Sequence, residues 1–135
     1  MKQESKTDYY RMTGMEYKPG IKSFVTFVVS HQIRFMKLWR KAHDRMTFWR
    51  RLRLIRYVRK YGLEISYEAE IGKGCYLGHP YNITMGSGVK IGDNVNLHKG
   101  CTIGRENRGR RAGAPTIGNR VSVGINSTIV GNIKI

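Results

Sequence analysis

Apolar side chains recur at every sixth residue through the second half of the chain. The positions that keep this register are Ile65, Ile71, Leu77, Ile83, Ile91, Leu97, Ile103, Ile117, Val123, Ile129 and Ile135. Glycine directly follows many of them, at Gly72, Gly78, Gly92, Gly104, Gly118 and Gly124. An amphipathic helix would place apolar residues three and four apart, and an ordinary strand would place them at alternate positions. A period of six with a trailing glycine instead indicates short parallel strands that are joined by tight turns and stacked into coils.

Small or β-branched residues often follow four positions after a repeat residue, at Ala69, Cys75, Ser87, Val95, Cys101, Val121 and Ser127. Such residues suit the corners of stacked coils, because little room is left where the chain turns. The register breaks twice, with two extra residues between Ile83 and Ile91 and eight between Ile103 and Ile117. We expect these breaks to form external loops, and loops are where function is most often placed.

Glycine usage divides the chain into two parts. Of the 16 glycines, 14 lie at or beyond Gly62. We therefore predict a basic helical N-terminal arm over residues 1–62 and a coiled β domain over residues 63–135. The arm has helical periodicity, whereas the domain has the period of six described above.

Two helices are expected in the arm, at residues 21–41 and 44–61, after the turn that Pro19-Gly20 predicts. Asp44 is the expected N-cap of the second helix and Gly62 its expected C-terminal stop. One apolar stripe runs along the second helix and predicts that this helix docks on another surface; it comprises Phe48, Leu52, Ile55 and Val58.

The chain is strongly basic, with 25 Lys and Arg against 9 Asp and Glu and a formal net charge of +16. Counted from the sequence, residues 1–64 hold 16 basic and 5 acidic residues, a net +11, so most of the positive charge lies in the arm. Such a field suits nucleic acid, anionic lipid or a phosphorylated cofactor, and the sign alone does not choose among them.

Several classes of protein are disfavoured by the sequence. The longest apolar run, residues 24–29, is far shorter than the ~20 residues of a spanning helix. The polar N-terminus does not resemble a secretory signal, so we expect a cytoplasmic protein that can lie peripherally at the inner membrane face. Cys75 and Cys101 form no metal-binding pattern with the four histidines, so no metal is expected and both cysteines are predicted to be free, buried thiols.

Three segments carry a resemblance to a known family. The motifs Gly74-Cys-Tyr-Leu-Gly-His79, Ile91-Gly-Asp-Asn-Val95 and Gly100-Cys-Thr-Ile-Gly104 resemble the serine acetyltransferase-like branch of the hexapeptide acyltransferases. This resemblance covers most of residues 62–135. Tyr10-Arg-Met-Thr-Gly14 and the basic helices also resemble, more weakly, the arm of a subgroup often encoded with surface-polysaccharide genes.

The resemblance implies a left-handed parallel β-helix, assembled as a homotrimer, with acetyl-CoA as co-substrate in the groove between subunits. Such a protein is an O-acetyltransferase. His79 matches the position of the family's catalytic histidine, and Glu64 falls where the family carries the acid that orients it. A hydroxyl is a poor nucleophile at neutral pH, so an imidazole must accept its proton as it attacks the thioester. A carboxylate then fixes the tautomer and stabilises the imidazolium.

Further residues are assigned more loosely. Within the resemblance, the acetyl-CoA groove would include Gly104, Arg105, Gly124 and Ile125. His98, Arg110 and Arg111 are candidates for binding the acceptor. Arg110 and Arg111 belong to a loop at residues 105–115, whose four arginines suit phosphate or another anion.

Each of these site residues also has an alternative interpretation without a functional role. For His79 the alternative is a turn residue beside Pro80, and for Glu64 a solvated surface charge. For His98 the alternative is a structural role, and for the loop a solvated tip.

The chain departs from the family where the acceptor is bound. Family members have Arg-His-Pro where this chain has Gly113, Ala114 and Pro115, and an Asp where it has Gly78. The acceptor is therefore L-serine or a sugar hydroxyl. Because the chain stops on a repeat position, Ile135, we also expect it to be truncated at its C-terminus.

Three other functions remain open from the sequence. A nucleic-acid binder is suggested by aromatic residues among the arginines of the arm, but the lack of a recognised motif disfavours it. A membrane-surface protein could dock through the basic amphipathic helix on anionic lipid. The third is a catalytically inactive trimeric β-helix scaffold.

Overall fold

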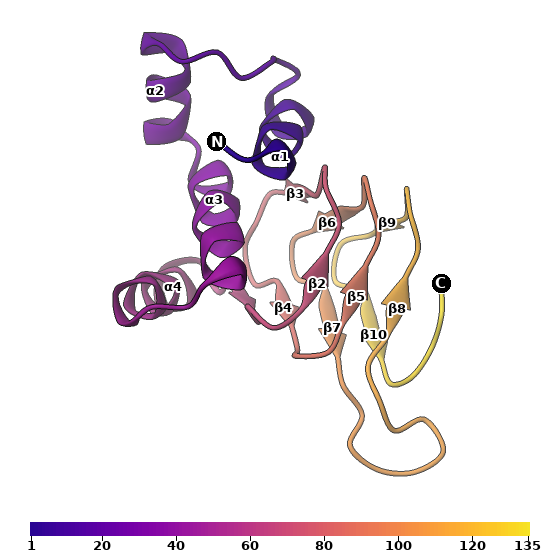
Figure 1. The fold of residues 1–135 in the computed structure, drawn as a ribbon. Coiled ribbons are helices and arrows are strands. Elements are labelled where there is room, and N and C mark those ends of the chain that lie inside the picture. Colours follow the sequence, from indigo (N-terminus) through magenta and orange to yellow (C-terminus); the bar gives the residue numbers. More distant parts are fainter.

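The structure, a computed structural model, describes all residues from 1 to 135. Four helices come first in the chain: α1 (Gln3–Thr13), α2 (Ile21–Val29), α3 (His31–Asp44) and α4 (Phe48–Tyr61). Ten short strands follow: β1 (Glu64–Ile65), β2 (Glu70–Ile71), β3 (Tyr76–Gly78), β4 (Thr84–Met85), β5 (Lys90–Ile91), β6 (Asn96–His98), β7 (Thr102–Gly104), β8 (Thr116–Ile117), β9 (Ser122–Val123) and β10 (Thr128–Val130). Figure 1 shows the helices gathered at one end of the stacked strands.

The strands form three parallel sheets that wrap around one interior. Sheet A has the order β1-β4-β7-β10, sheet B the order β2-β5-β8 and sheet C the order β3-β6-β9. Each coil contributes one strand to each sheet in turn. Matching residues therefore pair between coils, for example Ile71 with Ile91 and Leu77 with Leu97. The prediction of a left-handed parallel β-helix preceded by helices is confirmed.

One part of the predicted register is wrong. Met85, and not Ile83, pairs with Ile65 below and with Ile103 above, so Met85 is the repeat residue of its coil. The two extra residues consequently lie between Leu77 and Met85, where they lengthen the turn after β3. The predicted corner residue Ser87 is exposed, and Val89 is buried in its place. Ile83 is also buried, one position before β4, which is why the six-residue spacing includes it.

The predicted limits of the helices need correction as well. The helix expected over residues 21–41 is interrupted at Ser30, which has an extended backbone, and its second part continues to Asp44. Asp44 therefore ends α3 and is not the N-cap of α4. That cap is Thr47, whose side-chain oxygen accepts a hydrogen bond from the backbone N–H of Arg50. Helix α1 was not predicted.

Gly62 ends α4 as expected, in the left-handed conformation with φ 64°. The apolar stripe of α4 does not pack against the rest of the chain, because its four residues remain between 37% and 67% exposed, so its docking on another surface stays a prediction. Helix α4 packs instead through Leu54, Tyr57 and Tyr61. In this contact the ring of Tyr57 lies edge-on to the ring of Phe35, with centroids 5.3 Å apart.

The helices close the first coil of the β-helix. Phe35, Met36 and Trp39 of α3 are buried in the same hydrophobic cluster as Leu63 and Ile65 of the first coil. The indole N–H of Trp39 also donates to the carbonyl of Ser66, at 3.0 Å. The predicted boundary at residue 62 thus separates two kinds of secondary structure that share one core.

A buried ion pair fastens α1 and α3 to the coils. The guanidinium of Arg40 contacts both carboxylate oxygens of Asp8, at 2.9 and 3.1 Å. It also donates to the carbonyls of Ile71 and Gly72, while Asp8 accepts from the backbone N–H of Cys75 at 3.0 Å. Burial raises the pKa of Asp8, and the hydrogen bond and charge of Arg40 oppose that rise. Every charged group in this cluster therefore has a partner, as burial requires.

We predict that removing either partner of this pair destabilises the fold strongly. Asp8→Ala or Arg40→Met would leave one buried charge without its counter-ion, which typically costs about 3–5 kcal/mol of unfolding free energy. The double variant should lose less than the sum of the two single losses. Urea unfolding followed by circular dichroism measures these values. The control is Lys2→Ala, which breaks the exposed Lys2–Asp44 pair. A loss for Arg40→Met no larger than that of the control would contradict the prediction.

Candidate functional site

The turn from sheet C into sheet A carries His79. His79 is exposed and directly follows β3, with φ 47° in the left-handed region. Residues other than glycine adopt this left-handed backbone conformation at a cost in free energy, and they often do so at functional sites. The carbonyl of His79 accepts a hydrogen bond from the N–H of Tyr81 at 2.8 Å, which closes the turn.

The end of α4 and the next coil hold this turn in place. The N–H of Asn82 donates to the carbonyl of Tyr61 at 2.9 Å, and the N–H of Gly100 donates to the carbonyl of Tyr81 at 2.9 Å. The aromatic rings of His31, Tyr61 and Tyr81 form a cluster beside it, in which His31 stacks on Tyr61 with centroids 4.3 Å apart. The turn that carries His79 is therefore fixed both by the arm and by the next coil.

Glu64 lies at the same corner of the β-helix, at the start of sheet A. Its partner in the adjacent strand is Thr84, the residue at which the His79 turn enters β4. Glu64 is exposed and lines a hollow of about 400 Å³ between α4 and strands β1 and β4, together with Arg51. The structure thus brings the proposed base and its proposed orienting acid to one corner, although no hydrogen bond joins their side chains in the single chain.

His98 lies against Gly78, immediately before His79 in the chain. Gly78 and His98 are paired residues of β3 and β6, and His98 is half-buried. A Cβ atom at Gly78 would lie 2.6 Å from Nδ1 of His98 and 3.0 Å from the ring of Tyr76. The space that a side chain at position 78 would need is therefore filled by the imidazole of His98. This contact gives a physical reason why the chain has glycine there instead of the family's aspartate.

The remaining candidate residues divide between two corners. Gly124 and Ile125 follow β9 and lie at the corner between sheets C and A, two coils above His79; Ile125 is 56% exposed. Gly104 and Arg105, by contrast, lie at the corner between sheets A and B, where β7 ends. The loop at residues 105–115 leaves from that second corner. Within one chain, the two groups therefore do not share a corner.

The loop at residues 105–115 is an ordered projection. Glu106 and Gly113 form a two-way backbone pair, at 2.9 and 2.8 Å. The carbonyl of Arg111 accepts from the N–H of Asn132 at 2.9 Å, which ties the loop to the last coil. The side chains of Arg110 and Arg111 are exposed. Figure 1 shows the loop extending beyond the strands at the end of the molecule where sheet A lies.

Both cysteines are buried and free, as predicted. Burial raises the pKa of Cys75 to about 12 and that of Cys101 to about 11. Because the thiolate is the reactive form, neither is suited to act as a nucleophile near neutral pH. No group of His, Cys, Asp and Glu residues is arranged to hold a metal ion.

Sequence reasoning missed the contribution of the arm to this corner. His31 and Tyr61 contact Tyr81 in the His79 turn although 50 and 20 residues separate them from it in the chain. Burial lowers the pKa of His31, and the charges of Arg34 and Lys60 lower it further. The one signal in the sequence is the concentration of aromatic and basic residues in the arm, which does not specify a contact.

Comparisons with known proteins relate the chain to one family by sequence and by fold. No model of a known protein family matches it. Serine acetyltransferase of Helicobacter pylori is 29% identical over 117 residues, which make up 87% of this chain and 64% of that protein. Serine acetyltransferase of Staphylococcus epidermidis is 38% identical over 74 residues, 55% of this chain and 35% of that protein. The chain thus spans less than two thirds of the length of these relatives.

Solved structures give the same result for the fold. A Neisseria gonorrhoeae serine acetyltransferase in complex with serine superposes with a TM-score of 0.77 and 22% identity, covering 98% of this chain and 55% of that one. A Brucella abortus serine acetyltransferase in complex with coenzyme A superposes with a TM-score of 0.73 and 21% identity, covering 98% and 52%. The resemblance to the hexapeptide-repeat serine acetyltransferases is confirmed.

We predict that an aspartate is not tolerated at position 78. Gly78→Asp would force its Cβ into the ring of His98, and such overpacking typically costs about 1–3 kcal/mol of unfolding free energy. Gly86→Asp is the matched control, because the nearest atom to a Cβ there is 3.6 Å away. Adding His98→Ala should recover part of the loss at position 78. Urea unfolding compares the variants, and equal losses at positions 78 and 86 would rule the clash out.

Proposed function

We propose that this chain, which its sequence and fold relate to the hexapeptide-repeat serine acetyltransferases, is an acetyl-CoA-dependent O-acetyltransferase. The observation that carries the proposal is the corner between sheets C and A, where the strained His79 turn enters the strand next to Glu64. The complexes of similar proteins with serine and with coenzyme A support the choice of substrates. Assignment to a surface-polysaccharide subgroup stays a prediction.

In the proposed reaction His79 is the general base. Its imidazole accepts the proton of the acceptor hydroxyl while the hydroxyl oxygen attacks the carbonyl carbon of the acetyl thioester. When the carbon–sulfur bond breaks, the imidazolium returns the proton to the departing sulfur. The products are an acetyl ester and the free thiol of coenzyme A. Glu64 would accept a hydrogen bond from the N–H on the far side of the ring and stabilise the imidazolium, once substrate binding brings the two side chains into contact.

A homotrimer would complete this site. In one chain His79 lies at the corner between sheets C and A, whereas Arg105, Arg110 and Arg111 lie at or beyond the corner between sheets A and B. Rotation about a threefold axis parallel to the stacking direction of the coils can place the second corner of one subunit beside the first corner of the next. The groove between subunits would then combine His79 of one subunit with the arginine loop of another, and with Gly104, Gly124 and Ile125 along its length.

The acceptor remains L-serine or a sugar hydroxyl. Gly113, Ala114 and Pro115 provide no charged side chain to grip an amino-acid acceptor. Arg110 and Arg111 are exposed on the same loop and would take that role, with His98 placed next to the His79 turn by its contact with Gly78. An acceptor with a carboxylate or a phosphate would suit these two guanidinium groups.

We predict that His79→Ala lowers kcat/KM for acetyl transfer by about 10²–10⁴-fold, because it removes the base. Thiol release from acetyl-CoA, measured with L-serine and then with a panel of sugars, identifies the acceptor and tests the variant. Glu64→Gln should reduce the rate less, since it alters only the orientation and charge around the imidazole. The matched control is His43→Ala in the arm, which should change the rate less than twofold. Full activity in His79→Ala would reject the assigned base.

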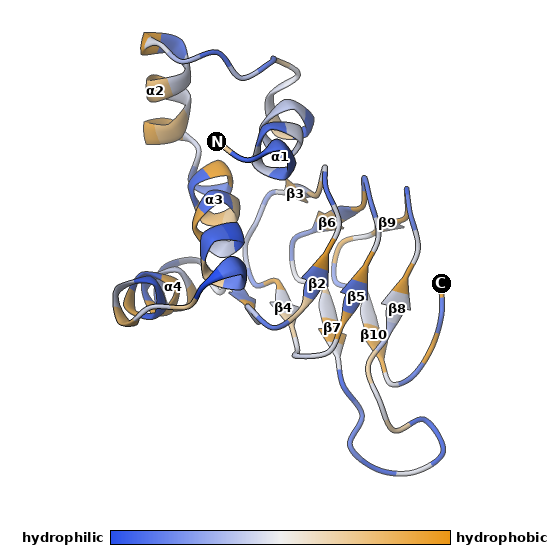
Figure 2. Cartoon of the chain, viewed as in Figure 1, coloured by the Kyte–Doolittle hydropathy of each residue, from blue (hydrophilic) through white to orange (hydrophobic).

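A second candidate function is association with a membrane surface, which could operate together with catalysis. None of the four helices has the length and apolar character needed to span a membrane. One face of α2 is nevertheless apolar and uncovered, with Ile21 84%, Phe24 68% and Val29 74% exposed. Figure 2 shows α2 standing away from the β-helix with much of its surface apolar. An apolar face on a basic arm is typical of helices that lie on anionic lipid.

We predict that the chain floats with vesicles that contain phosphatidylglycerol and not with vesicles of phosphatidylcholine alone. The double variant Phe24→Ser and Val28→Ser should weaken flotation, because it removes apolar area that would enter the lipid. The control is Val130→Ser with Ile135→Ser, which removes exposed apolar side chains from the last coil. Equal flotation of both double variants would exclude α2 as the anchor.

A further inference from the structure

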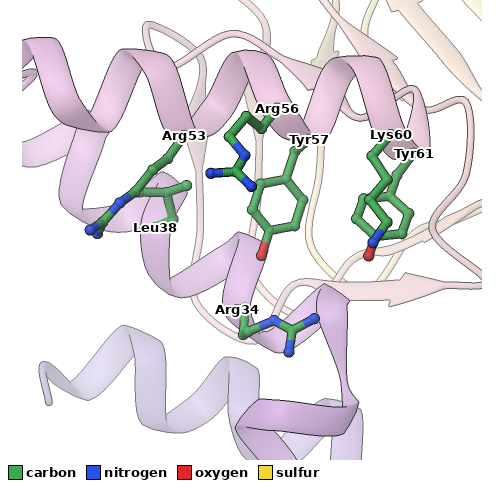
Figure 3. A pocket seen from close by; sticks show the side chains of 7 residues that line it. All are labelled: Arg34, Leu38, Arg53, Arg56, Tyr57, Lys60 and Tyr61. Atoms are coloured by element: carbon green, nitrogen blue, oxygen red, sulfur yellow. The ribbon is translucent and has the colours of Figure 1, made fainter.

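A groove between α3 and α4 is lined by positive charge. Its volume is about 380 Å³, and the residues around it are Arg34, Leu38, Arg53, Arg56, Tyr57, Lys60 and Tyr61. Figure 3 shows these side chains in the space between the two helices, with the hydroxyl of Tyr57 directed toward α3. The lining has four cationic side chains and no carboxylate.

These cations are not neutralised within the chain. The four salt bridges of the structure are Lys2–Asp44, Arg40–Asp8, Lys73–Asp93 and Lys90–Glu70, and none involves the groove. Arg34 donates to the carbonyls of Phe27 and Val28 in the last turn of α2, and so is held in position. The side chains of Arg53, Arg56 and Lys60 make no hydrogen bond to the protein. Like charges gathered without a counter-charge repel, so an anion in the groove would relieve that repulsion.

The helical repeat explains the arrangement. Arg53, Arg56, Tyr57, Lys60 and Tyr61 are spaced at i, i+3, i+4, i+7 and i+8, and therefore lie on one face of α4. The two tyrosines pack against α3 through Phe35 and His31. They form a fixed aromatic floor, and the cationic groups rise from it; the ammonium of Lys60 lies 5.3 Å from the ring centroid of Tyr61.

From this geometry we infer that the groove is a binding site for a phosphate-bearing ligand. Guanidinium groups match phosphate oxygens with paired N–H donors, and a lysine adds a compact positive charge. The tyrosine hydroxyls supply neutral donors at the floor of the groove. The ligand is either a free phosphorylated molecule or the headgroup of a phospholipid. The inference does not rest on acetyl transfer, because no residue of the groove has a part in the proposed reaction.

Inorganic pyrophosphate is the probe for the free ligand. Isothermal titration of the full chain with pyrophosphate at constant ionic strength should give saturable binding. Arg56→Gln should weaken it at least about fivefold, since one charge-assisted contact is lost. Arg59→Gln is the matched control, because it removes the same charge from the same helix outside the groove, and it should change the affinity less than twofold. Far-ultraviolet circular dichroism checks that both variants are folded.

Vesicles that contain phosphatidylglycerol test the other source. If Arg56→Gln weakens pyrophosphate binding and leaves flotation unchanged, the ligand is a free phosphorylated molecule. If Arg56→Gln weakens flotation more than Arg59→Gln does, with or without pyrophosphate binding, the ligand is a lipid headgroup. If pyrophosphate does not bind and flotation responds equally to both variants, the attraction is a general effect of net charge and the inference is overturned. It is overturned equally if pyrophosphate binds but Arg56→Gln and Arg59→Gln weaken both its binding and the flotation to the same extent.

Discussion

The stacking of one coil on the next determines the position of every candidate residue in the β domain. Parallel pairing aligns each interior side chain with the same position in the coil below, as in Ile71 with Ile91 and Ile91 with Ile117. Because neighbours in a strand point to opposite faces, this pairing also fixes which residues point outward. Extra residues cannot enter the strands without disturbing that alignment, so they collect at the corners. The turn after β3 and the loop at residues 105–115 are the two results.

The arm completes the β-helix at its first coil, and in doing so it also supports the candidate site. Without α3, the apolar residues of that coil would face water, and their burial is a large part of the stability of a small domain. The ion pair of Asp8 and Arg40 also fixes how α1 and α3 are oriented on the coil, because its hydrogen bonds reach the backbone at the end of β2 and before β3. The same packing places Tyr61 beneath the His79 turn. Helix packing and the conformation of the candidate base are therefore linked.

Local periodicity predicted the β-helix because each repeat makes the same contacts as the one before it. The sequence pattern could not show whether Ile83 or Met85 is the repeat residue of its coil. Both are buried, and only the strand pairing distinguishes them. The cap of α4 was assigned to Asp44 although Thr47 makes the hydrogen bond; both residue types cap helices well, and the tertiary path of the chain decides between them.

Contacts between distant parts of the chain were the least accessible to sequence analysis. The ion pair joins residues 32 apart, and α1 that supplies Asp8 is largely polar, with Asp8 and Tyr9 its only buried residues. The corner that His79 shares with Glu64 could be inferred from the family resemblance and from counting along the coils. The fit of His98 against Gly78 could not, because it depends on which residues face each other across two strands.

The net charge of the arm counts all its basic residues alike, but in the structure these residues have different roles. Arg40 is neutralised by Asp8, and Arg34 and Arg50 donate to carbonyls at the ends of helices, where positive charge is favoured. These arginines hold the fold together. Arg53 and Arg56 line a groove that contains no carboxylate, so their charge is available to a ligand. Tyr61 connects that groove to the candidate site, because its ring lines the groove and also contacts the ring of Tyr81 in the turn that carries His79.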